Sequence, residues 1–376
     1  MEMETTNIFD SGMIWLRADF HLHTRVDKEF TYTDIGSEFI GKYVDRLVDE
    51  GIGIGVITNH NKFDRDEYKS LRKAAQKRGV WLLPGAELSV NDGANGIHTL
   101  IVFDKDSWIG GNDDYINQFL TSVFEGVANR ENENTPCKYG LMEVLKRLNE
   151  HRIQGRDSFV ILAHVDQDKG FFEELDGGRI INIGKEELFR KSVLGFQKVT
   201  KYDTINNCKS WIGGWLPALV QGSDCKSIAG VGKAHVIDGK ETKVYVKIGD
   251  FNFDALKYAL MDSLHRISDE IPAQNKAYVK SISFSGGKLD GKEICFSPDL
   301  NNFIGIRGSG KSAIIEILRD AFGIELNDAA ADKSYKNDLV SYILGSGGKV
   351  TVNLRGNDGK NYRLERILGQ SASIYD

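Results

Sequence analysis

The sequence predicts an α/β fold divided between two domains, and three observations lead to it. Over the first 270 residues, short apolar runs alternate with stretches in which apolar residues recur every 3.6 positions. Most of these runs lie directly beside a side chain that can bind a metal ion. Near residue 305, a glycine-rich pattern lies between an apolar pair and a helical stretch. A length of 376 residues fits two or three domains.

His21 and His23 form the first metal-binding pattern. They follow the apolar run Met13–Leu16, where a strand is expected to end. Side chains at positions i and i+2 of an extended strand leave the same face, so both imidazoles can bind one metal ion.

Six further residues with metal-binding side chains follow along the chain. They are Asp27, His60, Glu87, His98, His164 and Asp224. The apolar runs beside them cover residues 52–58, 80–83, 99–103, 159–163 and 217–220. The other three histidines, His151, His235 and His265, stand on polar or helical stretches, where we expect structural roles.

Helical periodicity separates several of these runs, at Phe39–Val48, Tyr68–Lys77 and Leu141–Leu148. Strands that alternate with helices imply parallel βα units. In a closed βα barrel the C-terminal strand ends meet on one face, so ligands two hundred residues apart can share a pocket. The polar segments 110–138 and 167–185 are expected to be long surface excursions, and such loops often cover active sites.

The ordered motifs of residues 14–270 resemble those of the PHP (polymerase and histidinol phosphatase) domain. They are His21-Leu-His23, Ile57-Thr-Asn-His60, Pro84-Gly-Ala-Glu87, His98, Ala163-His164 and Gly222-Ser-Asp224. The resemblance implies a distorted seven-stranded βα barrel that holds two or three divalent metals and cleaves phosphate esters.

The resemblance also implies which residues bind each metal. The first metal would be held by His21, His23, Glu87 and Asp224. Glu87 would bridge to a second metal held by His98 and His164. A third would use Asp27, His60 and a histidine whose position is taken here by Lys226. Imidazole and carboxylate ligands suit Zn, Mn or Fe better than Mg, and we expect Zn or Mn.

Lys226 and Asn59 depart from the family pattern. A protonated ammonium cannot bind a cation, but its positive charge could partly replace that of a missing metal. Either two metals act together with Lys226 on the substrate phosphate, or the site has decayed. We favour the first alternative, with Lys226, Asp224 and His60 as catalytic residues.

A second domain is expected to begin with two strands, at Val279–Phe284 and Glu293–Phe296. Phe303-Ile304 then leads into Gly305-Ile-Arg-Gly-Ser-Gly-Lys-Ser312 and the helical run Ala313–Phe322. The pattern G-x-x-x-x-G-K-[ST] between a strand and a helix is typical of a P-loop. Lys311 would contact the β- and γ-phosphates of ATP, and Ser312 would bind Mg²⁺. The predicted nucleotide-binding residues are Gly305, Arg307, Gly308, Ser309, Gly310, Lys311, Ser312 and Gln370.

Asn301–Ser312 and the later strand Tyr362–Gln370 resemble the N-terminal lobe of SMC/RecF-type ABC ATPases, with Gln370 as the Q-loop glutamine. No apolar strand ending in an Asp-Glu pair follows Lys311, so Walker B is missing, and Leu344–Gly348 is interpreted as a β-turn. We therefore predict a phosphoesterase domain at 1–272 and part of an ATPase lobe at 273–376. This combination is similar to the TrlF-like ATPase family, which is associated with DNA repair and prokaryotic antiphage defence.

Composition sets broad limits on function. The net charge is −6, and residues 273–376 carry 14 basic and 12 acidic side chains, so the excess of acid lies in the first domain. An acidic domain does not resemble a free-standing nucleic-acid binder, although bound metals would offset its charge. Four cysteines without paired spacing indicate a reducing cytoplasm. No apolar run reaches the roughly 18 residues that a membrane span requires.

Three functional hypotheses follow from these patterns. The first is an ATP-controlled, metal-dependent nuclease that acts on nucleic acid and forms a homodimer or higher oligomer through its ATPase domain. The second is a phosphatase for nucleotides or other small phosphomonoesters. The third is a catalytically decayed scaffold for an ATPase. The departures from the family pattern at Lys226 and Asn59 are the reason for this hypothesis.

Overall fold

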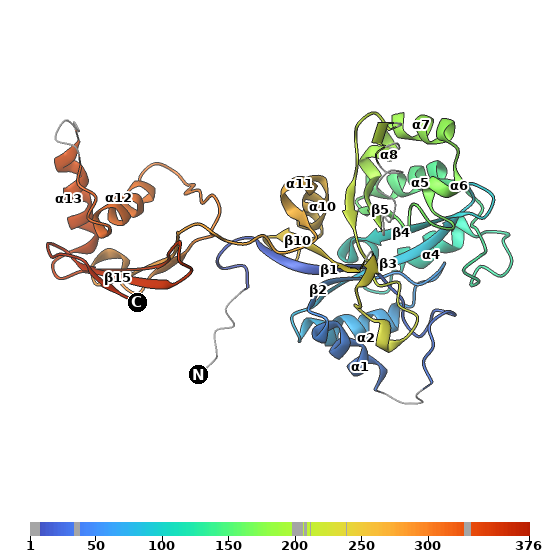
Figure 1. Cartoon of the computed structure of the whole chain (residues 1–376), viewed down its shortest axis with the longest axis horizontal. Helices are drawn as coiled ribbons and strands as arrows, with labels where there is room; N and C mark the ends of the chain where they lie inside the picture. Colours follow the sequence, from blue (N-terminus) through green and yellow to red (C-terminus); the bar gives the residue numbers. More distant parts are fainter. Residues whose placement is uncertain are drawn as a thin grey trace. The chain divides into compact units, whose positions relative to one another are not determined.

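The computed structural model describes residues 8–33, 38–197, 206, 209–210, 212–237, 239–326 and 332–376. These residues form two compact units, one of which comprises Trp15–Ile271. The other comprises Pro272–Asp376 together with the described residues up to Ile14. Cys208 lies outside the described residues. We call the first the barrel unit and the second the C-terminal unit (Figure 1).

One mixed sheet of nine strands forms the centre of the barrel unit, in the order β11-β10-β1-β2-β3-β4-β5-β6-β7. The strands are β1 (Ile14–Leu22), β2 (Ile52–Ile57), β3 (Trp81–Val90), β4 (Ile97–Phe103), β5 (Ser158–Leu162), β6 (Val193–Gln197), β7 (Ala218–Val220), β10 (Val244–Ile248) and β11 (Ile267–Ser268). A separate hairpin pairs β8 (His235–Ile237) with β9 (Lys240–Thr242).

The sheet curls back on itself where the chain leaves β7 and meets β1. The amide of Phe20 donates to the carbonyl of Gln221 at 3.1 Å, and the amide of Asp224 donates to the carbonyl of His21 at 2.8 Å. Gly222 lies at this join, where an added Cβ would stand 2.4 Å from the Cβ of His21, so only glycine fits. Strands β1 to β7 thus form a nearly closed, barrel-like sheet, which confirms the predicted α/β class.

Strand β4 runs opposite to its neighbours. It is antiparallel to β3 and to β5, whereas the other pairs between β1 and β7 are parallel. The prediction of parallel βα units is therefore wrong at β4, because residues 91–96 form a short connection with no crossover helix. The reversal places His98, near the start of β4, at the barrel end where the neighbouring parallel strands finish.

Helices pack around this sheet (Figure 1). The predicted helices are confirmed as α1 (Phe39–Asp49), α2 (Arg65–Gln76) and α5 (Leu141–Ile153). Helix α2 begins after Asp64, whose side chain accepts from the amides of Asp66 and Glu67 and so caps the first turn. Further helices of the barrel unit with described bounds are α3 (Lys105–Trp108), α4 (Tyr115–Val123), α6 (Phe171–Glu174), α7 (Gly177–Lys185), α8 (Glu187–Ser192), α10 (Phe253–Met261) and α11 (Ser263–Arg266).

Segments 110–138 and 167–185 are only partly surface excursions. Helix α4 buries Ile116 and Phe119, and the second segment buries Phe171, Ile180 and Ile183. These apolar side chains join the barrel core. The prediction fails here because a few well-spaced apolar residues are enough to dock a helix, whatever the overall polarity of the segment.

The C-terminal unit has a five-stranded antiparallel sheet in the order β13-β12-β14-β15-β16. Its strands are β12 (Tyr278–Ser285), β13 (Glu293–Cys295), β14 (Lys349–Arg355), β15 (Asn361–Ile367) and β16 (Ser373–Tyr375). Helices α12 (Lys311–Ala321) and α13 (Lys333–Leu344) share a small core with the sheet, formed by residues such as Ile282, Ile317 and Val352. The predicted strands near 279, 293 and 362, the helix after 312 and the turn at 344–348 are confirmed.

The strand predicted at Phe303-Ile304 does not form. This segment has no regular structure, and Ile304 is 92% exposed. The described part of the C-terminal unit provides no neighbouring strand for it, and an apolar pair alone does not hold an extended segment without a hydrogen-bonded partner. In the described part of the chain, no helix combines the length and apolar character that crossing a bilayer requires.

Candidate metal centre

All eight predicted metal ligands meet at one end of the barrel unit. They come from β1 (His21), the segments after β1 and β2 (His23, Asp27, His60), β3 (Glu87), β4 (His98) and the segments after β5 and β7 (His164, Asp224). Glu87 lies within β3, because that strand continues to Val90. Asn59 points elsewhere, since its amide group exchanges hydrogen bonds with Thr24. The barrel closure therefore gathers side chains that are spread over two hundred residues of sequence.

Glu87 lies between two groups of imidazoles. Its Oε2 stands 2.6 Å from Nε2 of His21, 3.1 Å from Nε2 of His60 and 3.5 Å from Nε2 of His23. Its Oε1 stands 2.7 Å from Nδ1 of His98 and 3.8 Å from Nε2 of His164. Each carboxylate oxygen therefore faces its own set of ring nitrogens.

Asp224 completes the group on the Oε2 side. Its Oδ1 lies 3.2 Å from Nε2 of His23 and 3.9 Å from Nε2 of His21. Gln197, which the sequence did not single out, supports the same group. Its side-chain oxygen lies 3.4 Å from Nδ1 of His21 and accepts from the amide of His164 at 2.9 Å. A glutamine in the last position of a strand carries no sequence signal that would have identified it.

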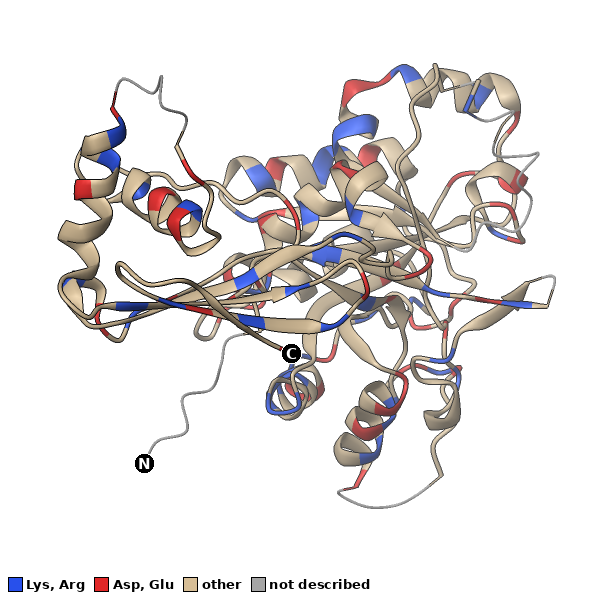
Figure 2. Cartoon of the chain, turned by 60° about the vertical axis from the view of Figure 1, so that its left-hand side comes forward, with Lys and Arg blue, Asp and Glu red and all other residues tan. Residues whose placement is uncertain are grey.

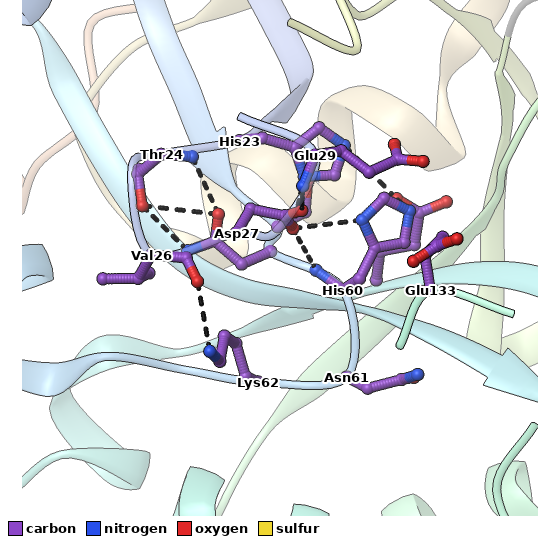
Figure 3. Close-up of polar contacts among 12 residues, drawn as sticks. His23, Thr24, Val26, Asp27, Glu29, His60, Asn61, Lys62 and Glu133 are labelled. Carbon is purple, nitrogen blue, oxygen red and sulfur yellow. Dashed lines mark hydrogen bonds and ion pairs between the residues drawn. The ribbon is translucent and has the colours of Figure 1, made fainter. Parts of the chain in front are cut away.

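Asp27 and His60 contact each other at the edge of the cluster. Oδ2 of Asp27 accepts from the amide of His60 at 2.7 Å and lies 3.0 Å from its Nδ1 (Figure 3). By the family resemblance, a third metal site would use these two residues and a histidine whose position Lys226 takes in this sequence. The structure brings Asp27 and His60 together, and Lys226 instead contacts two carboxylates.

Lys226 lies at the mouth of the site. Its Nζ stands 2.9 Å from Oδ1 of Asp224 and also contacts Oε2 of Glu29. Glu29 was not identified from the sequence, because a lone glutamate in a polar segment looks like a solvated charge. Burial alone would lower the pKa of Lys226, but Asp224 and Glu29 outweigh it and raise that pKa, so the ammonium stays charged.

The buried charges stabilise one another. Burial would raise the pKa of the Glu87 carboxyl, but His21, His60 and His98 hold it well below its usual range. Burial likewise opposes the charged forms of His21 and His23, yet Glu87, Asp224 and Asp27 raise the pKa of both imidazoles. For His98, burial dominates and lowers the pKa. The cluster therefore holds anionic carboxylates beside imidazoles of differing basicity.

Backbone strain is concentrated at this end of the barrel. Among the described non-glycine residues, positive φ angles occur at His164 (27°), Asp224 (49°), Lys169 (57°), Asn61 (53°) and Asn129 (57°). The first three line the cavity, and Asn61 follows His60 directly. Such conformations are unfavourable for residues with a Cβ, and they persist where the surrounding structure holds a functional side chain in place.

The donor set fits divalent metal ions. Within the described residues, Oε1 of Glu87, Nε2 of His98 and Nδ1 of His164 are buried atoms without a hydrogen-bond partner. Three triads have ligand atoms within 4.8 Å of one another, namely His21/His23/Glu87, His60/Glu87/His98 and His23/Asp27/His60. Buried imidazoles and carboxylates that converge while some of their ligand atoms lack a partner are the arrangement that Zn²⁺ or Mn²⁺ would stabilise.

A cavity of about 270 Å³ opens onto this cluster. Glu87, His60, His98 and His164 line it, and its rim carries Glu29, Glu133 and Asp168 together with Lys169 and Lys226. Two backbone-anchored segments frame the rim. Asn61 donates to the carbonyls of Asn132 and Thr135, and the amide of His98 donates to the carbonyl of Lys169. The cavity thus gives access to the predicted metal ligands from an opening that carries both acidic and basic side chains.

In the C-terminal unit, the predicted nucleotide-binding residues lie on an exposed loop. Gly305, Gly308 and Gly310 have φ angles of 153°, 84° and 87°, and α12 begins at Lys311. Nζ of Lys311 donates to the carbonyls of Gly305 and Ile306 at 2.8 Å. Arg307, Ser309 and Ser312 belong to the same loop and helix start, whereas Gln370 follows β15 in a turn.

Comparison with known proteins yields structural likeness only. No family model and no curated protein matches the chain. PsfC from Pseudomonas syringae is 16% identical with a TM-score of 0.38, covering 69% of this chain and 93% of that one. A Bacteroides vulgatus protein containing a predicted PHP-like metal-dependent phosphoesterase is 14% identical with a TM-score of 0.40, covering 78% and 88%. An amidohydrolase from Chromobacterium violaceum is 14% identical with a TM-score of 0.40, covering 58% and 91%. At these values the likeness assigns neither a family nor an activity.

Proposed function

We propose that the barrel unit is a PHP-type, metal-dependent phosphoesterase that works with two divalent ions, Zn²⁺ or Mn²⁺. The observation that carries the proposal is the position of Glu87, because each of its oxygens faces a separate set of imidazoles. A carboxylate in that position is suited to bridging two metals, with His21, His23 and Asp224 on one side and His98 and His164 on the other.

Two bound metals would supply a hydroxide nucleophile and stabilise the charge that develops on phosphorus. The residues of the chain would bind and orient the ester. Lys226 would bind a phosphate oxygen at the mouth of the cavity, after exchanging its contact with Glu29 for one with the substrate. Asp224 would hold that ammonium in place, and His60 would stand beside the reacting group.

Nucleic acid is the substrate that we propose first. The reason is the P-loop pattern from Gly305 to Ser312 in the same chain, which supports control by ATP and Mg²⁺ and assembly through the ATPase domain. This reason comes from analogy with other proteins that combine such domains, and not from the chemistry of the metal centre. Residues 273–376 carry 14 basic and 12 acidic side chains, and in Figure 2 both colours are interspersed along the ribbon of the C-terminal unit.

A phosphatase for small phosphomonoesters is the second candidate, and the rim of the cavity favours it. Glu29, Glu133 and Asp168 surround an opening of about 270 Å³. Carboxylates at the rim would repel the flanking phosphates of a continuous strand, whereas a single terminal phosphate meets mainly Lys226 and the metals.

The test is hydrolysis by the metal-loaded protein. DNA, RNA and a nucleotide panel are incubated with Mn²⁺ or Zn²⁺, with and without ATP, and the Glu87→Ala variant serves as control. We expect Glu87→Ala to lower the rate by at least about 100-fold, since removal of a metal-shell residue acts on this scale or above it. Strand cleavage supports the nuclease, and phosphate release from mononucleotides alone supports the phosphatase. Absence of turnover with every metal would leave only the scaffold hypothesis.

A further inference from the structure

We propose that Asp27 is a positioning residue rather than a metal ligand, and that Lys226 is a built-in cation that replaces a third metal. The barrel unit would then bind two metals, each close to Glu87. This inference rests on the proposed function in one respect, which is that metal ions bind at the site.

Both oxygens of Asp27 are already engaged by the protein (Figure 3). Oδ1 accepts from the amide of Glu29 at 3.0 Å. Oδ2 accepts from the amide of His60 at 2.7 Å and lies 3.0 Å from Nδ1 of the same residue. Nδ1 of His23 lies 3.2 Å from that oxygen, although it is not aligned for a hydrogen bond. Two backbone N–H groups and, in the tautomer with a proton on Nδ1 of His60, a third N–H surround this buried carboxylate. Together they leave little lone-pair capacity for a cation.

This arrangement aims the histidines at Glu87. With Nδ1 of His60 turned to Asp27, its Nε2 lies 3.1 Å from Oε2 of Glu87. Nε2 of His23, whose Nδ1 faces the same carboxylate without a hydrogen bond, lies 3.5 Å from Oε2 of Glu87 and 3.2 Å from Oδ1 of Asp224. A neutral imidazole offers one nitrogen to a metal while the other keeps its proton. A carboxylate that accepts this proton fixes the tautomer and raises the basicity of the ligand, which is the role we assign to Asp27.

Lys226 occupies the remaining side of the predicted third site. Its ammonium contacts Asp224 and Glu29, and the amide of Glu29 is bound by Asp27. One short turn, Asp27 to Glu29, therefore anchors both His60 and Lys226. A fixed positive charge against Asp224 opposes a further divalent cation there, while it supplies charge that can bind a phosphate oxygen.

A rival arrangement uses the same atoms. His23, Asp27 and His60 have ligand atoms within 4.8 Å of one another and could hold a third metal through their facing sides. In each of His23 and His60, Nδ1 would then bind the third metal beside Asp27, and Nε2 would bind a different metal beside Glu87. The arrangements differ in the number of metals bound and in what happens when the Asp27 carboxylate becomes an amide.

The test counts metals. The metal-free full-length chain is titrated with Co²⁺ and, separately, with Zn²⁺, and bound metal is measured by elemental analysis and by the visible spectrum of Co²⁺. We expect two ions per chain. Asp27→Asn should keep both ions with an affinity lower by about 10–100-fold, and with an altered Co²⁺ spectrum at full occupancy. The matched variant Asp224→Asn alters a predicted ligand and should lose one ion.

Three ions bound to the unmodified chain would overturn the proposal, as would loss of one ion in Asp27→Asn with the others bound as tightly as before. An unchanged affinity and spectrum in Asp27→Asn would also overturn it. If Asp27→Asn does not fold, the count in the unmodified chain still decides between two and three. Failure of the proposed function is distinguishable, because a chain that binds two ions without hydrolysing any ester contradicts the enzyme and not the count. A chain that binds no metal would overturn both proposals.

Discussion

The metal centre of the barrel unit and the glycine-rich loop of the C-terminal unit are built in opposite ways. Glu87 is 1% exposed and is surrounded by side chains from segments far apart in the sequence. The loop from Gly305 to Ser312 is contiguous and largely exposed, and the ammonium of Lys311 is bound by carbonyls of its own loop. The first site depends on barrel closure, whereas the second depends on local backbone conformation.

The two sites should therefore respond differently to substitutions. In the barrel, buried charges are tolerated only because opposite charges and hydrogen bonds compensate them, so a small displacement of one strand affects every ligand. In the loop, glycines adopt positive φ without support from other elements. Changes to the loop should therefore remain local, and changes to barrel packing should spread.

The largest effect is expected when Gly222 is replaced by alanine. The new Cβ would lie 2.4 Å from the Cβ and 2.6 Å from the amide nitrogen of His21, which would push the end of β7 away from β1. We expect loss of about 1–3 kcal/mol of unfolding free energy and much weaker metal binding, measured by denaturant unfolding and metal titration. Gly41→Ala on α1 is the matched control, because nothing lies within 4 Å of its Cβ position. It should gain roughly 0.5–1 kcal/mol. Equal behaviour of the two variants would show that β7–β1 closure does not control the centre.

A smaller effect is expected from pH. In the metal-free protein the pKa values of His21 and His23 are raised, so their contribution to stability is present below about pH 6.5 and is lost as the pH rises through the raised values. Metal ions need the neutral rings, so loading is favoured as the pH rises. The gain in Tm on adding Mn²⁺ or Zn²⁺ should therefore grow between pH 6 and pH 8, by roughly 3–6 °C per pH unit for each proton released. A gain independent of pH would mean that both rings are neutral before metal binds.

The smallest effect on the barrel is expected from Lys311→Ala in the exposed loop. The variant should lose nucleotide affinity, because its ammonium is the charge that would contact the phosphates. Metal content and the Tm of the barrel transition should stay within experimental error, since Lys311 contacts only its own loop in the described structure. Calorimetry of the unmodified protein and the variant measures the Tm and the nucleotide affinity, and elemental analysis measures the metal content. A drop in metal content would reveal that the two units are coupled and that the loop does not act locally.

Much of the architecture could be predicted because its signals are local. The 3.6-residue periodicity of residues 39–48 and 141–148 identified α1 and α5, and alternation identified β12. Strand direction could not be predicted in the same way. The pattern of β4 is compatible with either direction, and only the length of the connection at 91–96 decides that it runs antiparallel.

Residue type and spacing are local properties, so they already specify which side chains are available at the barrel end and that a P-loop pattern follows. How these side chains face one another depends on the folded arrangement of the strands. Pairing of β1 with β2 set Asp27 beside His60, and the join between β7 and β1 placed Glu29 against Lys226. The curled sheet set Glu87 between two groups of imidazoles. These contacts join residues up to two hundred positions apart, and their geometry follows from packing that no local pattern encodes.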